Sequence, residues 1–84
     1  MRMELIKSTV FTNSFTNEHL VTIALYRREV GYAILSEFGY KINGQTRLGK
    51  YEAEEYYFEV IEEIKNSFNS IEQPFTTKTE TNFI

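Results

Sequence analysis

The sequence contains no cysteine, no aspartate and no tryptophan, and its 84 residues include one histidine, His19. Without cysteine, neither a disulfide scaffold nor a thiolate metal site can form. The lack of aspartate and of a second histidine removes Ser-His-Asp and Cys-His catalytic sets, zinc centres, and aspartate-based magnesium or calcium loops. We therefore expect a binding protein with no catalytic residue, no metal and no cofactor, and we interpret His19 as a surface residue at the start of a strand.

Long apolar runs are missing as well. The start, Met1-Arg2-Met3-Glu4, leads into a brief apolar stretch, so neither a signal peptide nor a membrane span is predicted. The expectation is a soluble, cytoplasmic protein. A chain of this length makes one small domain with a modest core. We expect residues 1–75 to form a single α+β domain and residues 76–84 a polar tail, which either frays or adds an edge strand.

The net charge of −3 hides a strong asymmetry along the chain. Residues 1–51 carry seven basic residues against four glutamates, a net charge of +3, whereas residues 52–63 carry six glutamates and no base. Such asymmetry bears on partners and on association rates rather than on fold. The acidic block is therefore the first place to look for a binding surface.

Alternating branched and aromatic residues predict an antiparallel sheet in the first half of the chain. Asn43-Gly44 is a strong hairpin signal, because a type I′ turn needs positive φ at both central positions. A turn there places Tyr40 opposite Arg47, where the two side chains can form a cation–π pair. The sequence predicts three to four strands, at about residues 4–11, 19–27, 32–42 and 45–50.

The hydrophobic period changes from two to 3.6 after residue 50, which predicts one helix over about residues 51–69. Gly49 can serve as its N-cap, and Pro74 ends any continuation. The sequence predicts an α+β fold in which this helix packs on the sheet. The expected core stripe of the helix consists of Ala53, Tyr57, Val60, Ile61, Ile64, Phe68 and Ile71.

Both faces of the central strands are apolar. Val21, Ile23 and Leu25 point one way, while Ala24 and Tyr26 point the other. One helix covers one face, so the other face must meet a second copy, the C-terminal tail or a partner protein. We expect a homodimer that associates through this face.

Five glutamates fall within one arc of the predicted helix, opposite the core stripe, when the chain is stepped at 100° per residue. The arc is either a solvated face that keeps the protein soluble or an anionic surface that docks on a basic groove. Two aromatic residues edge it, as anchors of protein interfaces often do. The candidate partner-binding residues are Glu52, Glu55, Glu59, Glu62 and Glu63, flanked by Tyr56 and Phe58.

Basic residues interleaved with tyrosines on the predicted sheet suggest a rival site. Such a surface can bind single-stranded nucleic acid through stacking and phosphate contacts. The same charges can equally decorate strand edges and block aggregation. The candidate nucleic-acid-binding residues are Arg27, Arg28, Lys41, Arg47 and Lys50.

Residues 20–68 resemble a WGR domain in the order of strands, an aromatic-Gly motif, Gly-Gln-Thr and a helix with aromatic anchors. The matching residues are Phe38-Gly39-Tyr40 at the family's Trp-Gly-Arg, then Gly44-Gln45-Thr46 with Leu48, and Tyr57, Phe58 and Ile61 on the helix. The sequence departs from the motif where Phe38 replaces tryptophan and Tyr40 replaces arginine. The resemblance implies a strand–strand–helix order and, as an alternative function, recognition of DNA ends.

A second resemblance is one of type and has no residue signature. Small, acidic, cysteine-free single domains look like phage-encoded inhibitors, including many anti-CRISPR proteins, which resemble this chain in carrying acidic surfaces. That resemblance implies a non-enzymatic inhibitor that binds a basic surface of a nucleic-acid-binding host protein, such as a CRISPR effector. This is the main functional hypothesis from the sequence, and the WGR-like nucleic-acid binder is its alternative.

Overall fold

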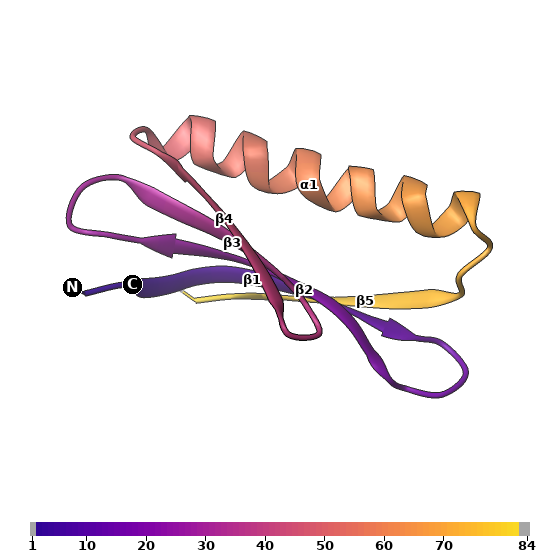
Figure 1. Cartoon of the computed structure of the whole chain (residues 1–84). Coiled ribbons are helices and arrows are strands. Elements are labelled where there is room, and N and C mark those ends of the chain that lie inside the picture. Colours follow the sequence, from indigo (N-terminus) through magenta and orange to yellow (C-terminus); the bar gives the residue numbers. More distant parts are fainter. Residues whose placement is uncertain (1, 83–84) are drawn as a thin grey trace.

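Five antiparallel strands form one sheet, and a single helix lies across one of its faces (Figure 1). The structure is a computed structural model and describes residues 2–82. The α+β fold with a helix packed on an antiparallel sheet is confirmed, but the sheet has five strands rather than three to four. The strand order is β4-β3-β2-β1-β5. In chain order the elements are β1 (Glu4–Asn13), β2 (His19–Arg27), β3 (Tyr32–Phe38), β4 (Lys41–Arg47), α1 (Lys50–Ser70) and β5 (Phe75–Thr81).

Helix α1 begins and ends within one residue of its predicted bounds. Gly49 is its N-cap, as predicted, with an extended backbone at φ −94° and ψ 147°. At the other end, the backbone N–H of Gln73 donates to the carbonyl of Phe68, and Glu72 has a positive φ of 56°. These bonds turn the chain back towards the sheet before Pro74 is reached.

The core lies between α1 and one of the two apolar faces that the sequence predicted for the central strands. Val21, Ile23 and Leu25 of β2 are 0–1 % exposed, and Ile34 and Phe11 lie beside them on the neighbouring strands. Burial of each such side chain contributes about 1.5–3 kcal/mol. The helix supplies Ala53, Tyr57, Ile61 and Ile64 as buried residues and Val60 and Phe68 at the edge of the core, whereas Ile71, expected in the stripe, is 70 % exposed.

The polar tail forms edge strand β5, which pairs antiparallel with β1. Three aromatic rings fasten it: Phe75 lies 5.5 Å from Phe11 and 5.6 Å from Phe68, and Phe11 and Phe68 are 5.8 Å apart between ring centroids. Of the two states that the sequence left open for the tail, the edge strand is the one found. Phe83, the other aromatic residue of the tail, lies outside the described residues.

The predicted turn at Asn43-Gly44 is wrong, because β3 and β4 are joined by Gly39 and Tyr40 instead. Phe38 pairs with Lys41 across the turn, and Gly39 has a φ of +58°. A glycine at the first central position with positive φ there alone is the pattern of a type II′ hairpin turn. Gly44 lies within β4 opposite Leu35, and an added Cβ at Gly44 would approach Leu35 Cδ2 to 3.0 Å.

The second face of the sheet is not covered by α1. Cross-strand register places Ala24 beside Leu35 and Tyr26 beside Ala33 on that face. Ala24 and Ala33 are 7 % and 6 % exposed, because larger neighbours overlap their small side chains. Strand β5 continues the sheet sideways and does not lie over this face. A second copy bound to this face stays a prediction.

Candidate functional site

The solvent-facing side of α1 holds the acidic residues that the sequence singled out. Glu55, Glu59, Glu62 and Glu63 are all exposed. They line a shallow depression along the helix together with Glu54, Asn66 and two aromatic side chains. The surface combines clustered negative charge with exposed apolar area. We call it the acidic face, and its members are Tyr51, Glu54, Glu55, Phe58, Glu59, Glu62, Glu63 and Asn66.

Tyr51 and Phe58 give the acidic face its apolar contact area. Their side chains are 75 % and 53 % exposed. Residues seven apart lie nearly over one another on a helix of 3.6 residues per turn, so the two rings share one side of α1. The prediction included Phe58 and missed Tyr51. The spacing of the two aromatic residues was the signal in the sequence that could have found it.

Phe58 lies at the border between the acidic face and the sheet. Its ring packs edge-on against buried Tyr57, with centroids 5.7 Å apart. The ammonium of Lys7, on β1, lies 5.2 Å from the Phe58 centroid. These contacts hold one side of the ring and leave the other open to a partner.

Tyr56 does not flank the acidic face as predicted. Its ring is half-buried against the core, and the guanidinium carbon of Arg47 lies 4.4 Å from the ring centroid. The predicted pair between Arg47 and Tyr40 is therefore wrong. Tyr40 is 95 % exposed in the β3–β4 turn, because the turn lies four residues earlier than the sequence suggested.

Glu52 also lies outside the acidic face. Its carboxylate folds back over Gly49 and occupies the space that a Cβ on that residue would take. A glutamate at the third helical position, close to the N-cap, sits at the positive end of the helix dipole. The side chain remains exposed, but its position serves the start of the helix.

One base accompanies the acidic block, where none was expected. The ammonium of Lys65 lies 3.7 Å from a carboxylate oxygen of Glu62, one helical turn away. Among residues 2–82, no other base lies within ion-pair distance of the glutamates at positions 52–63. The acidic face thus keeps most of its negative charge uncompensated.

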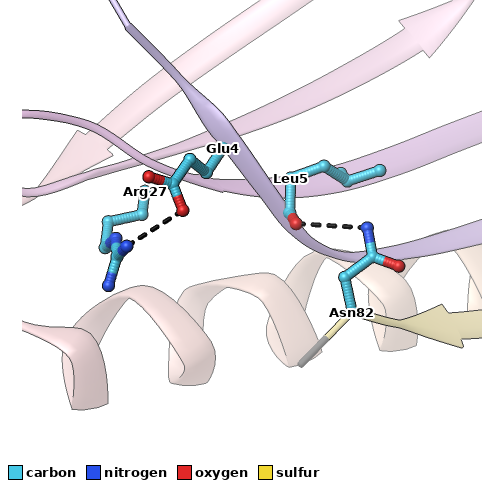
Figure 2. Close-up of polar contacts among 4 residues, drawn as sticks. All are labelled: Glu4, Leu5, Arg27 and Asn82. Carbon is cyan, nitrogen blue, oxygen red and sulfur yellow. Dashed lines mark hydrogen bonds and ion pairs between the residues drawn. The ribbon is translucent and has the colours of Figure 1, made fainter. Parts of the chain in front are cut away.

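The structure divides the basic residues of the rival site. Arg27 forms an ion pair with Glu4 at 2.9 Å (Figure 2) and lines a depression with Lys50 and Lys7, which the sequence did not single out. Arg47 lies across Tyr32 from Arg27 in the same row of the sheet.

Two of the rival residues lie outside this group. Arg28 is in the β2–β3 turn, where its N–H donates to the carbonyl of Gly31. Lys41 begins β4, about 20 Å from Arg47 at the spacing of an extended strand. The five residues therefore form no continuous basic surface.

Asn82, the last described residue, forms hydrogen bonds with the sheet beside the depression that Arg27 and Lys50 line. The side-chain amide of Asn82 donates to the carbonyl of Leu5 at 3.2 Å (Figure 2). Its backbone N–H donates to the carbonyl of Ile6 at 2.7 Å. These bonds continue the pairing of β5 with β1. They explain why the chain stays attached to β1 beyond Thr81.

The buried hydroxyl of Tyr57 has a structural role. It lies 2.6 Å from the hydroxyl of Thr9, which in turn lies 2.9 Å from the hydroxyl of Thr79. Burial raises the pKa of Tyr57, and the hydrogen bond with Thr9 acts in the opposite direction. The hydroxyl chain joins α1 to β1 in the core and continues to exposed Thr79 on β5.

His19 shares a hydrogen bond with Thr22 at 2.6 Å on the exposed surface at the start of β2. Within residues 2–82, no three histidine, aspartate or glutamate side chains are placed to hold a metal ion together. None of the helical segments in that range has the length and apolar character needed to cross a membrane.

Comparison with models of protein families, with curated proteins and with solved structures finds no match to this chain. The functional argument therefore depends on the geometry and charge of its own surfaces.

Proposed function

We propose that the protein is a non-enzymatic binding module that docks the acidic face of α1 on a basic surface of another protein. The observation that supports this proposal most is that negative charge and exposed aromatic surface occur together on the acidic face. Tyr51 and Phe58 are exposed on the same side of the helix as an almost uncompensated row of glutamates. A face selected for solubility alone needs the carboxylates and does not need exposed rings.

The two kinds of side chain have different roles in this proposal. Exposed ion pairs contribute about 0–1 kcal/mol each, so the glutamates set the choice of partner and the association rate more than the affinity. Aromatic rings that become buried in a partner pocket supply the larger share of binding energy. The predicted partner therefore carries lysine or arginine residues around an apolar pocket.

The most specific form of the proposal is inhibition of a nucleic-acid-binding protein. A row of carboxylates can occupy the lysine and arginine residues that otherwise hold phosphates. A phage-type inhibitor of a host enzyme, such as a CRISPR effector, fits this form. In that case the protein and nucleic acid compete for one groove, and raising the nucleic acid concentration weakens the binding of the protein.

The test is a calorimetric titration with an arginine-rich peptide that carries one aromatic residue, at low and at high salt. Charge reversal of the acidic face in E55K/E59K/E62K is expected to weaken binding at low salt by about tenfold or more, because three attractive charges become repulsive. The control is E18K/E29K/E37K, which changes the net charge equally at three exposed glutamates of the sheet region and its turns. Equal loss in both variants would show that net charge alone attracts the peptide, and the proposal would be wrong.

The aromatic contribution is measured separately with Tyr51→Ala and Phe58→Ala. Each is expected to weaken binding of the peptide about tenfold, as interface aromatics commonly do. The control is Tyr40→Ala, which removes an exposed aromatic ring in the β3–β4 turn. Circular dichroism must show that Phe58→Ala stays folded, because its ring also contacts Tyr57.

Nucleic-acid binding is the second candidate, supported by the grouping of Arg27, Lys50 and Lys7 around one depression. Glu4 and Glu54 offset much of that charge. Titration with labelled single- and double-stranded DNA at low salt tests it. Tight, salt-sensitive binding that is lost in R27A/K50A and kept in E55K/E59K/E62K would replace the main proposal with this one.

A further inference from the structure

Strand β5 forms a border of the sheet, and within residues 2–82 its one partner strand is β1. The backbone groups on such an edge can pair with another chain. Strand β5 also carries a charge pattern that complements itself, since Lys78 and Glu80 lie on either side of Thr79. We propose that a second copy of the protein pairs with this edge, antiparallel, with Thr79 opposite Thr79 of the second copy.

The backbone of β5 has the correct groups free for this pairing. The N–H of Asn82 donates to Ile6 on β1, and the register pairs Thr81 with Lys7 without interruption along the strand. Because N–H groups alternate in direction along a strand, Lys78 and Glu80 direct theirs towards β1. Odd-numbered residues direct theirs outward, and the outward-facing residues are Thr77, Thr79 and Thr81.

The proposed register uses all three outward residues. With Thr79 on the two-fold axis, Thr79 exchanges reciprocal bonds with itself, and Thr77 does so with Thr81 of the second copy. Lys78 then lies opposite Glu80, and symmetry repeats this pair. Lys78 and Glu80 form no backbone hydrogen bond across the new interface. Side chains that oppose each other at such positions approach most closely.

Charge selects this register over its neighbours. Centring the pair on Lys78 matches the full length of β5 but places two lysines directly opposite each other. Centring it on Glu80 does the same with two glutamates. Like charges in facing positions destabilise a sheet, whereas opposite charges stabilise it. The side chains of Lys78 and Glu80 are 80 % and 67 % exposed and lie 3.7 Å apart at their charged ends, so an alternating set of four charges can form.

A lysine in a border strand ordinarily blocks pairing with other chains. In the proposed register Glu80 of the second copy neutralises it, so the same lysine excludes foreign strands and accepts this one. Helix α1 makes most of its contacts with β2, β3 and β4, and β5 lies at the border of the sheet beyond β1.

Sedimentation equilibrium up to about 1 mM tests the dimer, because this range detects an association as weak as a millimolar Kd. K78E and E80K are each expected to weaken the dimer about tenfold, since each creates two like-charged pairs. The double variant K78E/E80K restores opposite charges in every pair and is expected to recover the dimer. A monomer throughout the concentration range, or single variants that associate like the natural chain, would overturn the proposal.

Disulfide formation between introduced cysteines tests the register. The natural chain has no cysteine, so every disulfide that forms joins two introduced residues. A mixture of K78C and E80C chains that differ in mass is expected to form the mixed disulfide, with one Lys78–Glu80 pair left intact in that dimer. Preferential linkage of K78C to itself would refute the Thr79 register. A dimer unaffected by all of these changes would point to the uncovered sheet face instead, and would also refute it.

These experiments are independent of the function proposed for the acidic face. Lys78 and Glu80 lie on β5, and the peptide-binding variants lie on α1. Loss of the dimer with peptide binding retained, or the reverse, therefore identifies which of the two proposals has failed.

Discussion

Thr9 is 2 % exposed, and replacing it with valine removes a hydroxyl that bonds with the buried hydroxyl of Tyr57 and with the hydroxyl of Thr79 on exposed strand β5. The hydroxyl of Tyr57 then loses its partner at 2.6 Å and remains buried. An unsatisfied buried hydroxyl costs about 1–3 kcal/mol. We expect T9V to lower the free energy of unfolding by about 2 kcal/mol, which for a domain of this size lowers Tm by roughly 8–16 °C.

The double variant separates this explanation from a general loss of packing. In Y57F the tyrosine hydroxyl is absent and Thr9 keeps its bond with Thr79, so about 1 kcal/mol is expected to be lost. In T9V/Y57F no hydroxyl remains buried without a partner at either position. The double variant is therefore expected to lose less than the two single losses together, with a coupling of about 1 kcal/mol.

Urea denaturation followed by far-UV circular dichroism measures each free energy of unfolding. The slope with urea concentration must stay constant across the variants for the comparison to hold. Losses in the two single variants that add up fully in the double variant would refute the reasoning, because they would show that the two hydroxyl groups do not depend on each other.

Three further changes test other parts of the structure. Burial raises the pKa of Tyr57, so the folded protein holds the phenol proton more tightly than the unfolded chain does. The free energy of unfolding is therefore expected not to depend on this group below pH 10 and to fall as the pH rises above 10. A comparison of urea midpoints at pH 9 and pH 11 measures this fall, and Y57F is expected to remove it. G39A is expected to lower the free energy of unfolding by about 1 kcal/mol, because the φ of Gly39 is positive, and G44A in strand β4 is expected to lower it less. If G44A lowered Tm more than G39A, the turn would lie at Asn43-Gly44 after all. G31A is expected to lower Tm the most of the three glycine variants. The φ of Gly31 is +78°, and an added Cβ would lie 2.5 Å from the carbonyl oxygen of Arg47. A Tm close to that of the natural chain would contradict this packing.

Periodicity predicted the elements whose burial decides their structure. The 3.6-residue period located α1 within one residue at each end. Alternation placed Val21, Ile23 and Leu25 on one face of β2, and the structure shows that this is the face buried under α1. These features follow from local sequence because one side of each element must leave water. The strand at residues 75–81 could be left only as one of two possibilities, because its threonines show no apolar alternation.

The β3–β4 turn shows why local signals can mislead. Asn43-Gly44 has stronger turn chemistry than Gly39-Tyr40, yet Gly44 lies within β4 opposite Leu35. A register is decided by all the facing pairs of two strands, and no single dipeptide reports that sum. The same shift explains why Arg47 lies on Tyr56 and not beside Tyr40.

The sequence predicted part of the acidic face. The structure adds Tyr51, Glu54 and Asn66 to it and leaves out Glu52 and Tyr56. The helical arc correctly placed Glu55, Glu59, Glu62 and Glu63 on the exposed side. It could not show that Glu52 folds towards Gly49 or that Tyr56 turns to the core, because those outcomes depend on side-chain contacts. Tyr51 was overlooked because it precedes the acidic block in sequence, although it lies on the same side of the helix.

The most direct test of the central proposal is a nuclear magnetic resonance footprint of the arginine-rich peptide on the isotope-labelled protein. We expect the shifted amide signals to cluster on α1 between Tyr51 and Asn66, with the largest changes near Phe58. Shifts gathered instead around Arg27 and Lys50, or spread evenly over the sheet, would contradict the claim that the acidic face is the binding surface.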